Sequence, residues 1–508
     1  MNLNASTPIP PPRCETGVPG LDTVLAGGLP EKRLFLVRGS PGTGKTTLAL
    51  QFLLQGRAIA DHCLYITLSE TKEELEVVAA SHGWSLEGIS LIELSSIEQH
   101  LKPEAQTTLL HPSEVELTRT MKLLEGEVER LKPRRVVFDS LAELRLLAQN
   151  PLRYRRQILS LKTFFATRDC TVLLLDDKSE EAGDQQVESI AHGVIELDHI
   201  RPEYGSARRR LSVLKLRGVR FRGGYHDYVI QTGGLEVFPR LIAAEHHADF
   251  PRESISCGVA ELDRLVDGGL DRGTSTLFLG PAGSGKSTLA IQFAAAAARR
   301  GEQSALFAFD ENVGTILARA NGLGMNIKPL IDSGKLRIQQ VDPAELAPGE
   351  FAAIVRRLVE NDGAKIIIID SMNGYLNAMP DERFLVTQLH ELLTYLSQRG
   401  VSTILVLAQH GLMGPMQSPV DLTYLADTVL MLRFFEFAGA IKKAISVVKK
   451  RSGDHEETIR EFGLVKGVGV RVGEPLKQFR GVLTGTPTYT GDGKSILFDG
   501  DEKQSFVK

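Results

Sequence analysis

Cysteine is scarce in this sequence, and long apolar runs are absent. The four cysteines, Cys14, Cys63, Cys170 and Cys257, lie far apart and form no C-x-x-C pair, so neither a metal cluster nor a disulfide framework is expected. No run of about 18 apolar residues occurs, and Met1–Pro12 has no basic segment followed by an apolar one. These absences argue against a membrane span and a signal peptide, and we expect a cytoplasmic enzyme with no membrane partner.

A strong excess of charge is also missing. The 508 residues carry a net charge of -4, with 42% hydrophobic and 24% charged residues, as in ordinary globular proteins. A slightly acidic total gives no general attraction to nucleic acid, although a local basic groove would not show in that sum. The length is sufficient for more than one sizeable core.

Two complete phosphate-binding loops stand out from this ordinary composition, and each fits G-x-x-x-x-G-K-[ST] in full. The glycines allow successive backbone N–H groups to point at the phosphates, the lysine reaches the outer phosphates, and the final hydroxyl completes a magnesium shell. We therefore expect two nucleoside triphosphates to bind, each with Mg2+. The expected ATP-binding residues are Gly39, Ser40, Pro41, Gly42, Thr43, Gly44, Lys45, Thr46 and Thr47 in the first loop, and Gly280, Pro281, Ala282, Gly283, Ser284, Gly285, Lys286, Ser287 and Thr288 in the second.

The surroundings of the two loops repeat as well. A lead-in segment, Gly17–Asp22, returns as Gly258–Asp263, and the correspondence continues at one constant offset until Glu70 and Glu311. A constant offset over that length indicates duplication of a whole domain, because the period is too long for a solenoid. We predict two homologous nucleotide-binding domains, at 13–245 and 246–488, with flexible ends at 1–12 and 489–508.

Short apolar runs, several of which end in a polar residue, predict a sheet in each half. Such runs suit strands that are buried on both faces of a mainly parallel sheet and covered by helices. We therefore predict an α/β fold in both domains, with ligands at the carboxyl ends of the strands. The expected strands are 34–37, 63–68, 135–138 and 171–175 in the first half and 276–279, 305–309, 366–369 and 403–407 in the second.

One aspartate in each half of the sequence is expected to hold magnesium. Asp139 and Asp370 each end an apolar run and precede a serine. Together with the loop hydroxyls of Thr46 and Ser287, they can bind Mg2+, usually through water on the aspartate side. An aspartate can also simply end a strand, but the complete loop upstream of each one favours the magnesium role.

Further carboxylates follow the strand after each loop: Glu70 in the first half, and Asp310 and Glu311 in the second. A carboxylate there can orient or deprotonate an attacking water, or accept a proton from a hydroxyl nucleophile. Alternatively, the pairs Glu70-Thr71 and Glu311-Asn312 simply open the next helix. We favour catalysis, and more for Glu311 than for Glu70, because Ser69 stands where a second carboxylate would be expected.

The lead-in segments, the two loops, the acidic residues and two basic segments together resemble KaiC and KaiC-like ATPases of the RecA superfamily. The basic segments are Lys215-Leu216-Arg217-Gly218 and Lys449-Lys450-Arg451. The resemblance covers roughly Arg13 to Thr488. It implies two tandem RecA-like domains, a homohexameric double ring with ATP between neighbouring subunits, slow ATP hydrolysis and, as in the clock members, serine/threonine autokinase activity in the second domain.

The resemblance also implies that Lys215 and Arg217, and likewise Lys449 and Arg451, reach the γ-phosphate bound by a neighbouring subunit. Cations there stabilise charge on the transferring phosphoryl group, and an arginine finger can contribute about 10³ to 10⁵ in rate. The alternative is a basic strand with its charges in solvent. The run Arg208-Arg209-Arg210 is expected to be a solvated turn, or at most a subunit contact.

The chain departs from the family at the phosphosite. Where clock members carry an adjacent Ser-Thr pair, alignment on Asp427-Thr428 gives Thr423 and Tyr424. An ordered two-site cycle is therefore not expected, and Thr423, with Ser418 as second choice, is the candidate single site. The segment Gly481–Thr488 resembles the family's regulatory C-terminal segment, near which a regulatory partner of unknown identity can dock.

We therefore expect a tandem RecA-like ATPase that signals through ATP binding and slow turnover. A DNA-dependent motor or recombinase on the same core is the alternative from another class. The acidic total argues against it, as does the lack of a helix-hairpin-helix, a zinc module or an aromatic-plus-basic tract. A third possibility is a nucleotide-dependent scaffold with little hydrolysis.

Overall fold

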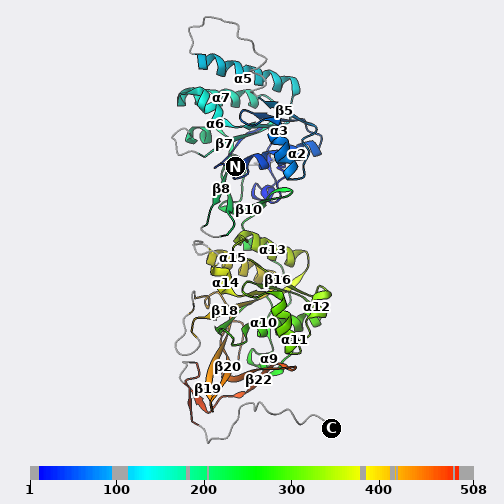
Figure 1. Ribbon diagram of the computed structural model, residues 1–508, viewed down its shortest axis with the longest axis vertical. Helices are drawn as coiled ribbons and strands as arrows, with labels where there is room; N and C mark the ends of the chain where they lie inside the picture. Colours follow the sequence, from blue (N-terminus) through cyan, green and yellow to red (C-terminus); the bar gives the residue numbers. More distant parts are fainter. Residues whose placement is uncertain are drawn as a thin grey trace, which may run out of the picture. The chain divides into compact units, whose positions relative to one another are not determined.

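The computed structural model describes residues 11–93, 112–178, 184–202, 205–377, 385–411, 418, 421–483 and 487–490. The chain divides between Arg240 and Leu241 into two compact units, which we call unit 1 and unit 2. In each unit, helices flank a central sheet (Figure 1). Within the described ranges, none of the helices combines the length and the apolar character that a membrane crossing needs.

Unit 1 contains a nine-stranded sheet within the described residues. Its spatial order is β11 (Gly234–Phe238), β10 (Tyr225–Gln231), β9 (Arg208–Leu216), β8 (Gly193–Ile200), β3 (Leu34–Gly39), β7 (Thr171–Asp177), β6 (Arg135–Asp139), β4 (Cys63–Thr67) and β5 (Ile89–Glu93). The six strands from β8 to β5 are parallel, and β9, β10 and β11 extend the sheet in antiparallel fashion. A small ladder of β1 (Arg13–Cys14) and β2 (Leu29–Pro30) precedes it. The helices are α1 (Leu21–Val24), α2 (Lys45–Ala58), α3 (Lys72–Ser81), α5 (Pro112–Leu131), α6 (Leu141–Ala148), α7 (Pro151–Ala166) and α8 (Asp184–Ile190).

Unit 2 repeats this plan over its described residues. Its nine-stranded sheet has the order β16 (Leu336–Gln340), β15 (Gln303–Ala308), β17 (Ala364–Asp370), β18 (Ser402–Gln409), β14 (Ser275–Pro281), β19 (Thr428–Phe437), β20 (Ala440–Lys450), β21 (Arg460–Val465) and β22 (Gly469–Pro475). Two-stranded ladders form from β12 (Ser254–Ile255) with β13 (Leu270–Asp271) and from β23 (Phe479–Arg480) with β24 (Thr488–Tyr489). The helices are η1 (Ala243–Glu245), α9 (Ala260–Leu265), α10 (Lys286–Arg299), α11 (Val313–Gly322), α12 (Lys328–Asp332), α13 (Pro348–Glu360), α14 (Met372–Asn377) and α15 (Leu385–Gln398).

The predicted α/β fold is confirmed, because all eight expected strands are present and their two faces are both buried. In β6, Val137 packs into one hydrophobic cluster, while Val136 and Phe138 pack into another on the opposite face. In β17, Ile366 and Ile367 divide in the same way. Successive side chains of a strand point to opposite faces, so a continuous apolar run fills two cores at once.

The lead-in segments serve a structural purpose. Asp22 accepts hydrogen bonds from the backbone N and the hydroxyl of Thr16, at 3.0 and 2.9 Å. Asp263 accepts them from the N of Cys257 at 2.8 Å and the hydroxyl of Ser256 at 2.5 Å. Burial raises the pKa of Asp22, although the bonds from Thr16 oppose that shift. In each unit, the aspartate therefore ties the segment before the short helix to that helix, ahead of the phosphate loop.

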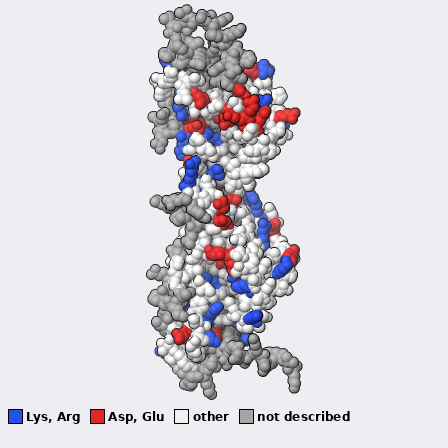
Figure 2. Space-filling model, viewed as in Figure 1, with Lys and Arg blue, Asp and Glu red and all other residues white. Residues whose placement is uncertain are grey.

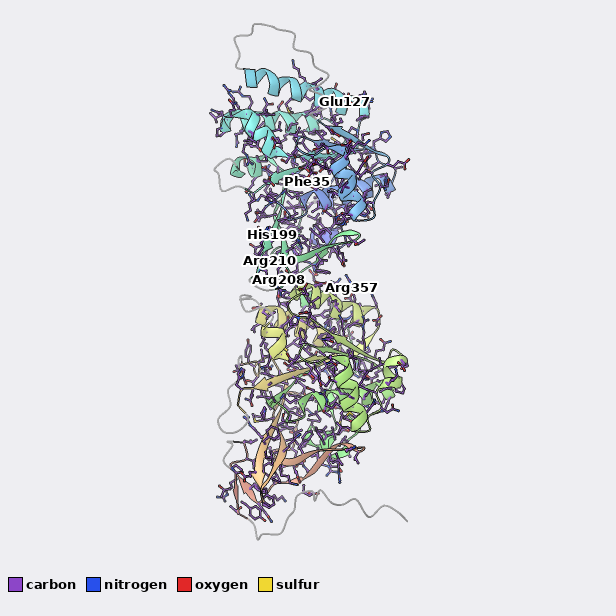
Figure 3. All side chains as sticks on the ribbon, viewed as in Figure 1. Phe35, Glu127, His199, Arg208, Arg210 and Arg357 are labelled. Carbon is purple, nitrogen blue, oxygen red and sulfur yellow. The ribbon has the colours of Figure 1, made fainter. Side chains whose placement is uncertain are left out.

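The expected turn at Arg208-Arg209-Arg210 is wrong, because the three arginines begin strand β9 (Figure 3). Arg210 lies opposite Asp198 of β8 and Asp227 of β10, and its guanidinium lies over the ring of Tyr225, 4.6 Å from the centroid. Opposite charges on neighbouring strands stabilise a sheet. The two aspartates opposite Arg210 therefore stabilise the basic start of the strand at that position.

Most of the two predicted flexible ends lies outside the described residues. Tyr489 is described, and its ring packs on the rings of Phe437 and Phe479, with centroids 5.1 and 5.2 Å away. Phe435 and Val482 are buried in the same small cluster. Part of the segment after β22 is therefore held against the end of the sheet in unit 2.

Candidate nucleotide sites

Each phosphate loop connects a buried strand to the first turn of a long helix. The N-caps of α2 and α10 are Gly44 and Gly285, both left-handed with φ of 91° and 108°. A Cβ at Gly44 would lie 2.5 Å from Cδ1 of Ile230, and one at Gly285 would lie 2.8 Å from Cε1 of Phe462. Glycine has no side chain with which to cap the helix, so the N–H groups of the first turn remain available to an anion.

The loop lysines are folded back onto their own loops. The Nζ of Lys45 donates to the carbonyls of Gly39 and Ser40 at 2.7 and 3.3 Å, and to Oδ1 of Asp177 at 2.7 Å. The Nζ of Lys286 donates to the carbonyls of Gly280 and Pro281 at 2.9 and 2.8 Å. Burial lowers the pKa of Lys286 to about 8, although the charge of Asp370 opposes this.

The predicted magnesium residues of unit 1 come together. The Oγ1 of Thr46 lies 3.4 Å from Oδ2 of Asp139. The hydroxyl of Tyr65 donates to the same oxygen at 2.5 Å. Burial raises the pKa of Asp139, and the bond from Tyr65 is the largest influence in the other direction. Sequence reasoning missed Tyr65, whose only signal is a phenol hydroxyl in the middle of a mostly apolar strand.

The predicted magnesium residues of unit 2 also come together, with different neighbours. Ser287 hydrogen-bonds Asp370, and burial raises the pKa of Asp370 to about 6. The hydroxyl of Ser371 donates to Asp310. Leu306 stands at the position of Tyr65, so unit 2 has no hydroxyl there. The peptide bond after each of these aspartates is cis, Asp139–Ser140 in unit 1 and Asp370–Ser371 in unit 2.

These groups fit Mg2+ and a triphosphate. Carboxylate and hydroxyl oxygens are the ligands that Mg2+ prefers, and each unit has one of each beside its loop. The loop of unit 2 also holds Ser284, whose buried hydroxyl has no hydrogen-bond partner within the described part of the chain. A buried hydroxyl without a partner is costly, and an oxygen of a bound phosphate would satisfy it.

The candidate catalytic carboxylates differ between the units. In unit 1, Oε2 of Glu70 is buried and has no hydrogen-bond partner among the described residues. Burial, and then the charge of Asp139, raises the pKa of Glu70. In unit 2, Nη1 of Arg319 donates to both carboxylate oxygens of Glu311, at 2.5 and 2.7 Å. Sequence reasoning favoured Glu311, but the structure shows fewer polar contacts for the carboxylate of Glu70 than for that of Glu311 among the described residues.

Neither glutamate is the N-cap of the following helix. Thr71 caps α3 and forms a capping box with Glu74, and Asn312 caps α11 through a bond from the N of Thr315. Glu70 and Glu311 each stand one residue before the cap. Thr71 and Asn312 are the second residues of the two pairs that the alternative interpretation expected to open these helices, and that part of it is confirmed. The catalytic roles of Glu70 and Glu311 stay predictions.

The basic segments of the two units make equivalent contacts. Lys215 donates to the carbonyl of Glu188, and Arg217 donates to the carbonyl of Ser189 at 2.8 Å. Burial lowers the pKa of Lys215, and the charge of Arg217 adds to this shift. These carbonyls belong to α8, so both cations contact a helix of their own unit.

In unit 2, the corresponding cations hold the segment that contains the candidate phosphosite. Lys449 donates to the carbonyls of Thr423 and Ala426 at 2.7 and 2.6 Å. Arg451 donates to the carbonyl of Tyr424 at 2.9 Å. Within this segment, the hydroxyl of Thr423 donates to Asp421 at 2.6 Å. The other candidate, Ser418, accepts a 3.4 Å bond from Gln409.

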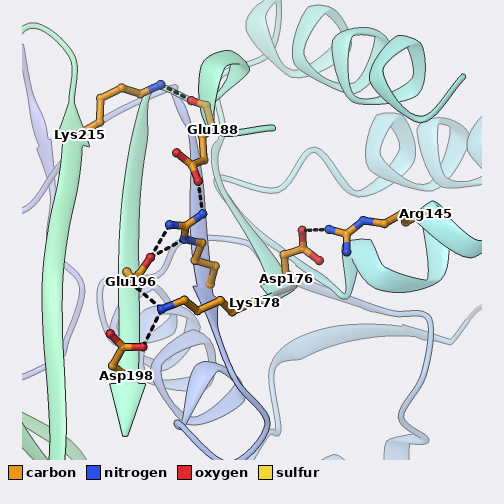
Figure 4. Close-up of polar contacts among 8 residues, drawn as sticks. Arg145, Asp176, Lys178, Glu188, Glu196, Asp198 and Lys215 are labelled. Atoms are coloured by element: carbon orange, nitrogen blue, oxygen red, sulfur yellow. Dashed lines mark hydrogen bonds and ion pairs between the residues drawn. The ribbon is translucent and has the colours of Figure 1, made fainter. Parts of the chain in front are cut away.

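A charged network that the sequence did not reveal connects the loop strand of unit 1 with α8 (Figure 4). Arg38, which precedes the loop, pairs with Glu188 and donates to Glu196 at 2.7 Å. Lys178 continues the network to Glu196 and Asp198 at 3.1 and 3.0 Å. In unit 2, Leu279 and Met431 hold the equivalent places in the register of β14 and β19. The network is thus specific to unit 1.

Comparisons with known proteins agree with the duplicated architecture. A protein-family model described as "ATPase: KaiC" matches residues 14–242 and 255–477. The chain is 24% identical over 497 residues to the circadian clock protein KaiC3 of Synechocystis sp., with 96% of this chain and 97% of that protein covered. It is 26% identical over 499 residues to the circadian clock oscillator protein KaiC of Picosynechococcus sp., with 96% and 94% covered. It is 27% identical over 483 residues to the circadian clock protein KaiC2 of Synechocystis sp., with 93% and 84% covered.

Proposed function

Because the chain belongs to the KaiC family of ATPases, we propose that both of its tandem domains bind Mg-ATP and hydrolyse it slowly within a homohexameric double ring. The observation that carries the proposal is the same in both units. An uncapped helix start, a loop lysine, a loop hydroxyl and a buried aspartate converge beside the end of the loop strand. This is the set of groups that phosphoryl transfer requires.

In unit 1, the chain's own residues divide the work. The N–H groups at the start of α2 and the ammonium of Lys45 bind the phosphates. Thr46 and Asp139 would hold Mg2+, which neutralises charge on the phosphates when it is bound. Glu70 would orient the attacking water and accept its proton, because burial raises its pKa and one of its oxygens has no partner among the described residues. In unit 2, the corresponding residues are Lys286, Ser287, Asp370 and Glu311.

The contacts of the two basic segments support the proposal that the chain assembles into a ring. Backbone carbonyls outside the phosphate loop of the same unit accept hydrogen bonds from Lys215, Arg217, Lys449 and Arg451. A cation that contributes to catalysis from such a position would act on the nucleotide of a neighbouring copy. Hydrolysis would then depend on ring formation, and a regulatory protein could read the nucleotide state of the ring as a conformational signal.

We also propose that unit 2 phosphorylates Thr423. Its hydroxyl lies in a segment held by Lys449 and Arg451, and Tyr424 is exposed with a longer side chain. Phosphoryl transfer depends on positioning of the acceptor oxygen, so a phenol would not replace a threonine hydroxyl. Incubation with labelled ATP followed by peptide mass spectrometry tests this. Phosphate on Tyr424, or none while ATP is hydrolysed, would leave an ATPase alone.

A DNA-dependent motor remains the alternative from another class. Acidic side chains gather on one face of unit 1 near α3 (Figure 2), where Glu73, Glu74 and Glu76 are exposed. Such a surface repels a phosphate backbone. Size-exclusion mass with and without Mg-ATP, combined with a DNA-stimulation assay on the same sample, separates the two functions. The ring ATPase predicts nucleotide-dependent hexamers without DNA stimulation, and a strong stimulation by DNA would contradict it.

A further inference from the structure

Asp177 holds the phosphate-binding lysine of unit 1. Its Oδ1 lies 2.7 Å from Nζ of Lys45, and the lysine side chain is 11% exposed against 46% for the aspartate. The pair joins the last residue of β7 to the first residue of α2, across the mouth of the loop. The ammonium that must bind the outer phosphates of a nucleotide therefore already has an anionic partner.

The duplicated unit shows that this partner is not a general requirement of the fold. Asp177 is in register with Gly39, and Ala408 is in register with Gly280, the matching glycine of the second loop. Ala408 bonds through its backbone to the side-chain amide of Asn373, at 2.7 and 2.9 Å. The lysine of unit 2 bonds only to loop carbonyls among its described partners. The two units thus present the same loop with and without a competing carboxylate.

We propose that Asp177 is an affinity-determining residue of unit 1, whose carboxylate competes with the phosphates of a bound nucleotide for the ammonium of Lys45. The inference rests on the proposed function, since it concerns the same nucleotide site. A phosphate that takes Lys45 must displace Asp177 and then lie near its negative charge. Both consequences weaken binding, and neither operates in unit 2.

The surrounding charges strengthen the effect. Asp139 lies within range of both members of the pair, because Lys45 lowers its pKa and Asp177 raises it. The charge of Lys45 also acts to lower the pKa of Glu70, against the effect of burial. Lys45 is therefore the shared cation of several carboxylates in unit 1. Asp177 is the carboxylate that bonds Lys45 directly. Its removal would strengthen the attraction between the ammonium of Lys45 and a phosphate.

The experiment uses full-length protein with Lys286→Ala, so that unit 1 is the intact site. Binding of a fluorescent N-methylanthraniloyl derivative of ATP is titrated in the presence of Mg2+, with and without Asp177→Asn. We expect the dissociation constant to fall about fivefold, in the range of a partly exposed ion pair. The matched control is Asp169→Asn, which removes one negative charge of unit 1 that pairs with Lys32 instead. It should leave the dissociation constant unchanged.

The reciprocal variant keeps the test decisive if Asp177→Asn misfolds. In a Lys45→Ala background, Ala408→Asp should raise the dissociation constant of unit 2 about fivefold. An unchanged or weaker affinity with folded Asp177→Asn, or an unchanged affinity with Ala408→Asp, would overturn the inference alone. Undiminished binding to a Lys45→Ala, Lys286→Ala double variant would instead overturn the proposed function.

Discussion

The hydroxyl of Tyr65 donates a 2.5 Å hydrogen bond to Oδ2 of Asp139, inside the sheet of unit 1. Tyr65 is fully buried, and Asp139 is 6% exposed. A buried carboxylate needs hydrogen-bond donors, and this one obtains a donor from the neighbouring strand. The bond fixes one oxygen of the aspartate that we expect to bind Mg2+, and it is special to unit 1 because Leu306 stands at the equivalent position.

Tyr65→Phe should lower the free energy of unfolding of unit 1 by about 1–3 kcal/mol, because it removes a hydrogen bond to a buried charged group. The chain has a single tryptophan, Trp84, and it lies in unit 1. Its fluorescence in urea therefore reports on that unit. Tyr225→Phe, on an exposed ring, is the control and should change little. Equal midpoints for Tyr65→Phe and the unchanged protein would show that the bond contributes nothing.

Glu70→Gln should slow hydrolysis in unit 1 while nucleotide binding persists. Loss of a general base typically costs about 10²- to 10⁴-fold in rate. The measurement is steady-state phosphate release in a Lys286→Ala background, with nucleotide binding followed in parallel. Glu73→Gln, at an exposed position in the first turn of α3, serves as control. A rate unaffected by Glu70→Gln would remove this residue from the mechanism.

The finger assignment predicts complementation between copies. A ring mixed from Arg217→Ala and Lys45→Ala chains contains some interfaces with both groups intact, so hydrolysis in unit 1 should be partly restored. Both chains carry Lys286→Ala to silence unit 2. If mixed rings of verified composition show only the sum of the separate activities, Arg217 acts within its own chain or not at all.

His192 should make unit 1 sensitive to acid. Burial, and then the charges of Lys162 and Arg33, lowers the pKa of His192 from 6.5 to about 4. The unfolded chain therefore binds a proton between pH 6.5 and 4 that the folded chain does not, and the folded state loses stability as the pH falls through this window. Trp84 fluorescence in urea at several pH values measures the slope. His192→Asn should flatten it, and an unaltered slope would contradict the assignment.

Local patterns predicted the loops and the central strands well. The motif G-x-x-x-x-G-K-[ST] is continuous in sequence, and β6 and β17 are apolar on both faces. The antiparallel strands β9 and β10 are partly exposed and carry charges, so a search for apolar runs does not find them. For the same reason, the basic start of β9 was predicted to be a turn.

Contacts that depend on the register between distant strands could not be predicted. Tyr65 and Asp139 are 74 residues apart, and Lys45 and Asp177 are 132 apart. Their meeting requires the order β4-β6-β7-β3, which no local pattern contains. Glu311 lies just before α11, and Arg319 lies within that helix. Because Arg319 pairs with Glu311, the candidate base with a carboxylate oxygen that lacks a partner among the described residues is Glu70, although the sequence favoured Glu311.

The number of nucleotides bound per chain tests the account most directly. Equilibrium dialysis with labelled ATP and Mg2+ should give two nucleotides for the unchanged protein, one for Lys45→Ala or Lys286→Ala, and none for the double variant. Each loop supplies one uncapped helix start and one lysine, so each substitution should remove one site. A single nucleotide on the unchanged chain, or undiminished binding to the double variant, would contradict the claim that both units are nucleotide sites.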